Sequence, residues 1–169
     1  MHQLAQLAKE AVEQYILKRE RINVPETMNE EFITARRGVF VCLKKEHQLR
    51  GCIGTFMPTA KSVAEETVKN AIAAAIDDPR FPPVLPDELD MLAYTVDVLS
   101  EPEEVSGMGE LDPKKYGIIV VKDNRRGLLL PDLEGVSTVE QQIGITKMKA
   151  GILSDEGMKI FRFTVDRYQ

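Results

Sequence analysis

The residues with the most distinctive chemistry lie in residues 49–56 (LRGCIGTF), where a single thiol, Cys52, stands between two glycines. A cysteine becomes a nucleophile when its pKa is lowered, and the nearby Arg50 supplies part of the positive field that lowers it. Gly51 and Gly54 leave space beside the backbone, so that a ligand or another strand can approach closely. Backbone N–H groups near both glycines would be further donors. The segment therefore predicts a nucleophilic site at Cys52 with Arg50, Gly51 and Gly54 as ligand contacts.

The competing interpretation is that Cys52 is an inert, buried residue, as most buried cysteines are. The chain has only His2 and His47 as imidazole bases, so a Cys–His pair of the protease type is hard to assemble. Cys42 is the only other thiol. Two cysteines are too few for a disulfide framework or a cysteine zinc site, so both are expected to be reduced. Whether their side chains share a face of the hairpin depends on its register, which the sequence leaves open.

Arginine side chains are the candidate contacts for an anionic ligand, because a guanidinium group binds carboxylate or phosphate through two parallel hydrogen bonds. Arg50 and Arg80 lie beside segments rich in glycine or proline, and they are the preferred anion contacts. For Arg125 and Arg126, which lie in a turn, a solvated surface position is the simpler interpretation.

Metal and cofactor chemistry have little support in the sequence. The two histidines are far apart, and the Asp-Asp-Pro sequence at 77–79 is explained more simply as the end of a helix. The phosphate-loop, dinucleotide and nucleophile-elbow motifs are absent from the chain. We therefore predict no metal site and no cofactor.

The elements that must position these residues follow from periodicity and turn chemistry. Helical spacing of apolar residues predicts helices over residues 2–22, after Ser62 and after Ser137, and the last two begin with S-x-x-E capping boxes. Alternating and β-branched segments predict strands. The predicted strands are 39–43, 49–56, 93–99, 117–121, 128–131 and 161–165, and a rigid proline-rich connector covers residues 81–86.

The order of these elements suggests an internal repeat. A strand that begins at a glycine, an Arg-Gly pair in the return strand and a capped helix occur twice, in residues 36–78 and 93–153. Two such hairpin-plus-helix units would pack into one α+β body with a largely antiparallel sheet. We expect a single domain over residues 1–169, with the two repeats as lobes. The second repeat has GLLLP where the first has GCIGT, so the strand itself can be explained as scaffold, and Cys52, Gly54 and Thr55 are the residues that still need an explanation.

Composition excludes several classes of protein. The 169 residues have no apolar run long enough to span a bilayer and no secretory signal, so a cytoplasmic location is expected. The net charge of -5 and the aromatic content of 6% argue against nucleic-acid binding.

Taken together with DPRFPP at 78–83, GLLLP at 127–131 and KAGI at 149–152, the octapeptide LRGCIGTF closely resembles the signature of the AMMECR domain family. The resemblance runs from about residue 8 to residue 163. It implies an α+β fold in which two related repeats contribute to one barrel-like sheet. It also implies a Memo-like protein and a radical S-adenosylmethionine enzyme as partners, in the so-called AmmeMemoRadiSam set. It implies no particular reaction.

The leading hypothesis is an enzyme or enzyme component that binds a small anionic or carbonyl-bearing ligand, with Cys52 as nucleophile and Arg50, Gly51, Gly54, Thr55 and Arg80 as contacts. The competing hypothesis is a non-catalytic adaptor or regulatory protein whose glycine-rich strand receives a partner chain at its edge. A nucleic-acid-related role is the third and weakest hypothesis.

Overall fold

The computed structural model describes residues 1–169, which divide into two compact units. Unit 1 comprises Met1–Val98 and Asp166–Gln169, and unit 2 comprises Leu99–Val165. Unit 2 is therefore an insertion in unit 1, because the chain leaves unit 1 after Val98 and returns to it at Asp166. None of the helices combines the length and the apolar character needed to cross a membrane.

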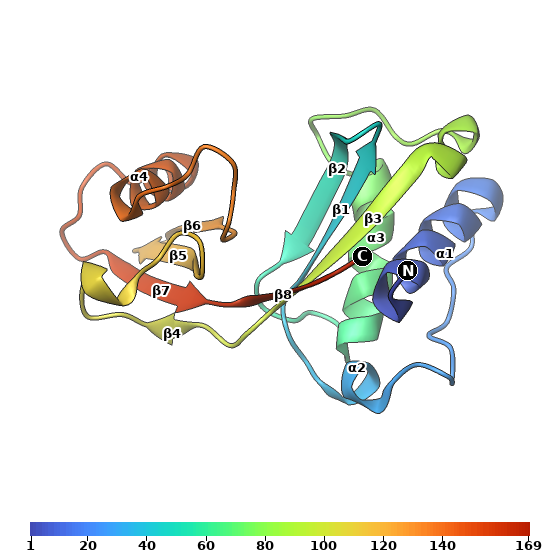
Figure 1. The fold of residues 1–169 in the computed structure, drawn as a ribbon, viewed down its shortest axis with the longest axis horizontal. Coiled ribbons are helices and arrows are strands. Elements are labelled where there is room, and N and C mark those ends of the chain that lie inside the picture. The colour runs from blue at the N-terminus through green and yellow to red at the C-terminus, as the bar shows by residue number, and fades with distance from the viewer. The chain divides into compact units, whose positions relative to one another are not determined.

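Unit 1 is an open antiparallel sheet with helices packed on one face (Figure 1). The strand order is β2-β1-β3-β8, and β1 pairs antiparallel with both β2 and β3. Its elements are α1 (Gln3–Lys18), α2 (Glu30–Thr34), β1 (Val39–Lys45), β2 (Gln48–Thr55), α3 (Val63–Ile76), the 3-10 helix η1 (Pro86–Met91), β3 (Leu92–Leu99) and β8 (Val165–Tyr168).

The core of unit 1 lies between this sheet and the helices α1 and α3. Val39, Val41 and Leu43 of β1 point into it, together with alternate residues of β3 and the apolar stripes of both helices. Since side chains alternate along a strand, the pairing of Leu43 with Gly51 and of Val39 with Thr55 places Gly51 and Thr55 on this helical face. Cys42 and Cys52 consequently lie on the opposite, open face.

Unit 2 has its own four-stranded sheet, in the order β4-β7-β5-β6, and its own core beneath α4. Its elements are β4 (Glu103–Glu104), the 3-10 helix η2 (Met108–Glu110), β5 (Gly117–Lys122), β6 (Arg125–Leu129), α4 (Val139–Ala150) and β7 (Lys159–Phe163). The pairs β4–β7, β5–β6 and β5–β7 are all antiparallel.

The mixed helix and strand composition and the antiparallel pairing predicted from the sequence are confirmed, but the single barrel-like sheet is wrong. The strands form two separate open sheets, each with two edge strands, and no closed barrel is present. The sequence pattern predicts strands but not which strands pair, so it could not show that 93–99 and 117–121 belong to different sheets.

Two local features differ from the sequence analysis. The short helix α2 lies between α1 and β1, where no element was predicted. Helix α4 is capped by Thr138 and Gln141, one residue later than the predicted box, and their side chains bond to each other's backbone N–H at 3.2 and 3.1 Å. Ser137 and Thr138 are both good capping residues, so the position was ambiguous.

The internal repeat stays a prediction. Residues 36–78 lie in unit 1, whereas residues 93–153 begin in unit 1 and continue in unit 2. Both hairpins do use the glycine of an Arg-Gly pair in the same way. A Cβ on Gly51 would lie 2.1 Å from the carbonyl oxygen of Ala74 in α3, and one on Gly127 would lie 2.5 Å from that of Thr146 in α4. In each unit, glycine allows a helix backbone to approach the return strand.

Candidate functional site

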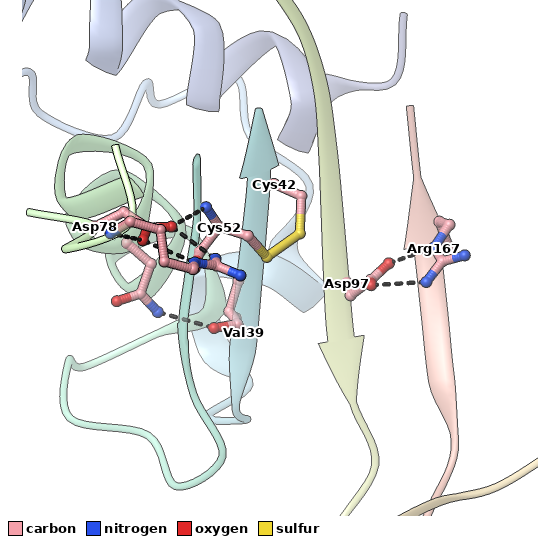
Figure 2. Close-up of a disulfide and its surroundings, with 8 residues drawn as sticks. Val39, Cys42, Cys52, Asp78, Asp97 and Arg167 are labelled. Atoms are coloured by element: carbon pink, nitrogen blue, oxygen red, sulfur yellow. Dashed lines mark hydrogen bonds and ion pairs between the residues drawn. A yellow bond between two sulfur atoms is a disulfide. The ribbon is translucent and has the colours of Figure 1, made fainter. Parts of the chain in front are cut away.

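The hairpin register places Cys42 directly opposite Cys52, and the two cysteines form a disulfide (Figure 2). Their Cα atoms lie 4.1 Å apart. Directly opposed residues that exchange no backbone hydrogen bonds are the closest pairs of an antiparallel ladder. The expectation of reduced thiols was therefore wrong, because the number of cysteines says nothing about their pairing across a hairpin.

The backbone of Cys52 faces the outer edge of the sheet, where two side chains hold it. Its N–H donates to Asp78 Oδ2 at 2.9 Å, and its carbonyl oxygen accepts from Arg80 Nη2 at 3.3 Å. Arg80 also donates to Asp78 through Nε at 2.9 Å and through Nη2 at 2.7 Å. We call this arrangement of Asp78 and Arg80 on Cys52 the Cys52 clamp. It occupies the positions at which another strand would pair with Cys52.

Asp78 is the buried member of the clamp and was not among the predicted site residues. Its side chain is 2% exposed, whereas that of Arg80 is 55% exposed. The hydrogen bonds from Arg80 hold the pKa of Asp78 well below its usual range, although burial opposes this. The hydrogen bond from the Cys52 N–H also lowers this pKa. From the sequence, Asp78 was predicted only to end a helix. The Asp-Pro-Arg order, which brings a carboxylate and a guanidinium two residues apart, was the available signal.

Arg50 lies at a register shift of the hairpin and does not point toward Cys52. Leu43 pairs with Gly51 but Lys44 pairs with Leu49, so Arg50 is an extra residue in β2. Its guanidinium binds both carboxylate oxygens of Glu88, with Nε–Oε1 and Nη2–Oε2 distances of 3.0 and 2.9 Å. It also donates to the carbonyl oxygens of residues 82 and 83 in the proline-rich connector. Arg50 thus attaches this connector to the sheet.

Glu88 is a second buried carboxylate that was not among the predicted site residues. Its pKa is lowered to about 2, mainly by the hydrogen bonds from Arg50 and also by those from Leu85 N–H and Lys45, although burial opposes this. Its side chain is only 11% exposed. A buried carboxylate with a lowered pKa stabilises the fold only while it is ionised.

This pKa predicts a specific loss of stability in acid. The pKa of Glu88 falls from 4.5 in the unfolded chain to about 2 in the fold, so its contribution is complete above about pH 4.5 and is lost as the pH falls toward 2. This contribution is worth up to about 3 kcal/mol. Unfolding by guanidinium chloride should be measured at several pH values. Between pH 4.5 and 2, the free energy of unfolding should decrease less for Glu88→Gln than for the wild type. Parallel curves would contradict this role for Glu88.

Gly51 and Gly54 are both explained by packing against protein atoms. Gly51 meets the carbonyl of Ala74, as described above. A Cβ on Gly54 would lie 2.2 Å from the ring of Phe40, its cross-strand partner. The Phe40 ring therefore occupies the space that the missing side chain leaves, and neither glycine leaves an open cradle at its Cα.

Thr55 belongs to a buried hydrogen-bond network on the helical face. Its hydroxyl donates to Glu66 Oε1 at 2.7 Å and accepts from the Asn70 side chain at 3.1 Å. Glu66 also accepts from the hydroxyl and N–H of Thr59 and from the N–H of Ala60. Burial alone would raise the pKa of Glu66, but these hydrogen bonds hold it below its usual value. The network ties the end of β2 and the loop after it to α3.

The predicted site residues thus fall into separate groups. Cys52 and Arg80 are in contact at the open face and edge of β2, and Gly54 is on the same face. Gly51 and Thr55 face α3, while Arg50 binds Glu88. Their roles toward a ligand stay predictions.

Two concave sites have no lining residue from β2. One, in unit 1, has a volume of about 80 Å³ and is lined by Glu31, Phe32, Ala35, Arg37, Val63, Val98, Asp166 and Tyr168. The other, in unit 2, has a volume of about 460 Å³ and is lined by Ser100, Glu101, Glu103, Tyr116, Arg162, Phe163 and Thr164.

Comparison with known proteins gives one consistent result. The family model AMMECR1 matches residues 5–168. A protein from Thermotoga maritima is 54% identical over 99% of this chain and 98% of its own length. The protein CA_C1420 from Clostridium acetobutylicum is 49% identical over 96% of this chain, which corresponds to 35% of that longer protein. The crystal structure of the uncharacterized protein PH0010 from Pyrococcus horikoshii superposes with a TM-score of 0.90 at 36% identity, covering 97% of this chain and 88% of that one.

Proposed function

Because the chain belongs to the AMMECR1 family over nearly its whole length, we propose a function centred on residues 49–56, the segment that carries the family signature. The protein is an enzyme, or a component of one, that acts through Cys52 on a small anionic or carbonyl-bearing ligand. The Cys52 clamp is the observation that carries this proposal. It fixes the backbone of a cysteine on an open sheet face and holds a guanidinium group beside it.

Arg80 is the ligand contact that the geometry supports best. Its Nε and Nη2 groups bind Asp78 and the Cys52 carbonyl, whereas its Nη1 group makes no hydrogen bond within the chain. With a side chain that is 55% exposed, Arg80 can bind a carboxylate or phosphate from solvent. Arg50 is a weaker candidate, since its side chain is 13% exposed and its guanidinium is already bound to Glu88.

The chemistry requires the reduced form of Cys52. Once the disulfide is opened, the Cys52 thiolate can add to the carbonyl carbon of a 2-oxo acid, and the carbonyl oxygen takes up a proton. The product is a thiohemiketal, with the ligand carboxylate at Arg80. Thr55 and the two glycines support this site indirectly, by fixing β2 against α3 and Phe40.

A thermal shift experiment with the reduced protein tests the proposal. We expect pyruvate to raise the melting temperature, since a ligand at ten times its Kd stabilises by about 1.4 kcal/mol. Lactate, which has a hydroxyl group in place of the keto group of pyruvate, should stabilise the protein less. The pyruvate shift, measured against each variant's own ligand-free protein, should be lost in Cys52→Ser and in Arg80→Ala and kept in Arg37→Ala, which removes an exposed arginine outside β2. If pyruvate, lactate and phosphate all leave the reduced wild type unchanged, the proposal fails.

The adaptor function is the second candidate, with a Memo-like protein or a radical S-adenosylmethionine enzyme as the proposed partner. It is supported by the Clostridium relative, of which this chain matches only 35%, so a related domain occurs within a longer chain. The clamp argues against docking by strand addition at Cys52, because Asp78 and Arg80 occupy those backbone groups. A nucleic-acid-related role has less support, since the net charge is -5 and Arg50 and Arg80 are paired with carboxylates.

A further inference from the structure

Cys42 and Cys52 are held in place independently of the bond between them. Cys42 lies in β1, the strand that pairs with both β2 and β3. Cys52 lies in β2, and its outward-facing backbone is held by the Cys52 clamp. Opening the S–S bond removes none of these contacts.

The disulfide also contributes little to holding distant parts of the chain together. The two cysteines are 10 residues apart, in one hairpin whose strands are already joined by a backbone ladder. The core under the hairpin is formed by the other face of the sheet. A disulfide stabilises mainly by restricting the unfolded chain, and it does so least when the closed loop is short. The fold should therefore survive reduction.

The position of the two sulfur atoms favours exchange. Both cysteine side chains are half-buried on the open face of the sheet, whereas the alternating residues of β1 on the other face are fully buried. Figure 2 shows the disulfide between the Asp78 group at the edge of the sheet and the Asp97–Arg167 ion pair across β3 and β8. Exchange requires a thiolate to reach one sulfur, and both cysteine residues keep some solvent exposure, unlike Val41 and Leu43 beside Cys42 in β1.

From these observations we infer that Cys42–Cys52 is a reversible redox centre that exchanges with dithiols while the fold stays intact. A thiolate of the dithiol attacks one cysteine sulfur, the S–S bond breaks, and the other cysteine leaves as a thiolate and takes up a proton. The second thiol of the reductant then attacks the mixed disulfide and releases the first cysteine. Two electrons and two protons pass from the dithiol to the protein, and the dithiol becomes a disulfide.

The reverse reaction should be fast because the cysteines stay paired when reduced. With Cα atoms 4.1 Å apart on fixed strands, the two thiols remain in reach of each other. Asp78 is the positioning residue for this step, through its hydrogen bond to the Cys52 N–H. The redox centre controls whether the Cys52 thiol of the proposed function is available, but its test needs no ligand.

The experiment compares native and denatured protein in dithiothreitol. We expect complete reduction without denaturant, detected by iodoacetamide labelling of both thiols and mass spectrometry, with an unchanged circular dichroism spectrum. Oxidised dithiothreitol should then restore the bond. The variant Cys42→Ser should form a mixed disulfide with glutathione at Cys52, and the double variant Cys42→Ser/Cys52→Ser should fold and take up no label.

Reduction that occurs only in denaturant, or a reduced protein that unfolds, would overturn the inference and show that the bond is structural. Asp78→Asn should slow re-oxidation several-fold, while the exposed neighbour Asp77→Asn should leave the rate unchanged. Equal rates in both variants would overturn the role of Asp78. If the disulfide is reversible but the reduced protein binds neither pyruvate nor lactate nor phosphate, this inference is supported and the proposed function is rejected.

Discussion

Gly51→Ala is expected to lower the free energy of unfolding by about 3 kcal/mol, which is the upper range for overpacking a well-packed site. The added Cβ would lie 2.1 Å from the carbonyl oxygen of Ala74. This oxygen belongs to the backbone of α3, so no side-chain rotation can relieve the contact. Either α3 must move away from β2, or the hairpin must shift. Chemical denaturation monitored by circular dichroism measures the loss.

The matched control for this substitution is Gly144→Ala in α4. A Cβ there meets no atom within 4 Å, and the position is inside a helix. Alanine should therefore be neutral or stabilise by up to about 1 kcal/mol. Within the same unit as this control, Gly127→Ala should behave like Gly51→Ala, because its Cβ would lie 2.5 Å from the carbonyl oxygen of Thr146. Near-neutral effects at Gly51 would show that the strand and helix are not in close contact.

Glu66→Gln is expected to lower the free energy of unfolding by about 3 kcal/mol, because buried hydrogen-bond donors lose their charged acceptor. The Glu66 side chain is fully buried and accepts hydrogen bonds from Thr55, Thr59 and Ala60. An amide retains one acceptor oxygen but turns an NH₂ group toward the remaining donors. The loop that follows β2 would lose its attachment to α3, and equilibrium unfolding should show the loss.

The pH dependence separates Glu66 from an exposed acid. Its lowered pKa means that its stabilisation is complete above the unfolded value of 4.5 and is lost as the pH falls below it. The difference in the free energy of unfolding between the wild type and Glu66→Gln should therefore become smaller in acid. The adjacent Glu65 is exposed and is the matched control, since Glu65→Gln should change stability by no more than about 0.5 kcal/mol. Equal effects of the two substitutions would contradict a buried network.

Both predictions bear on how the signature segment should be understood. Gly51, Gly54 and Thr55 are used for packing and for internal hydrogen bonds, and Arg50 secures the connector through Glu88. The segment is therefore largely a structural device that fixes one cysteine. Cys52 forms the disulfide with Cys42, and Arg80 holds its carbonyl oxygen, so these two residues are the ones to which the proposed function assigns a further role.

The sequence by itself determined the local structure and the family of this protein. Periodicities of two and 3.6 residues are local properties, so they predicted the hairpins and the long helices within a few residues. The octapeptide at 49–56 was sufficient for the family, which the match over residues 5–168 confirms. The sequence also predicted Cys52, Arg50 and Arg80 as candidate site residues, although it did not show their contacts, and their roles toward a ligand stay predictions.

Only the tertiary structure decided which side chains meet. Arg50 and Glu88 are 38 residues apart, and Cys52 and Asp78 are 26 apart, so no local pattern joins them. The pairing of Cys42 with Cys52 depends on register, and the register shift after Leu43 sends Arg50 toward Glu88. Likewise, Glu65 and Glu66 are adjacent acids in the first turn of α3, yet the loop after β2 covers Glu66 and leaves Glu65 exposed. Such contacts depend on how strands and helices pack over long range, and this packing determines the candidate site.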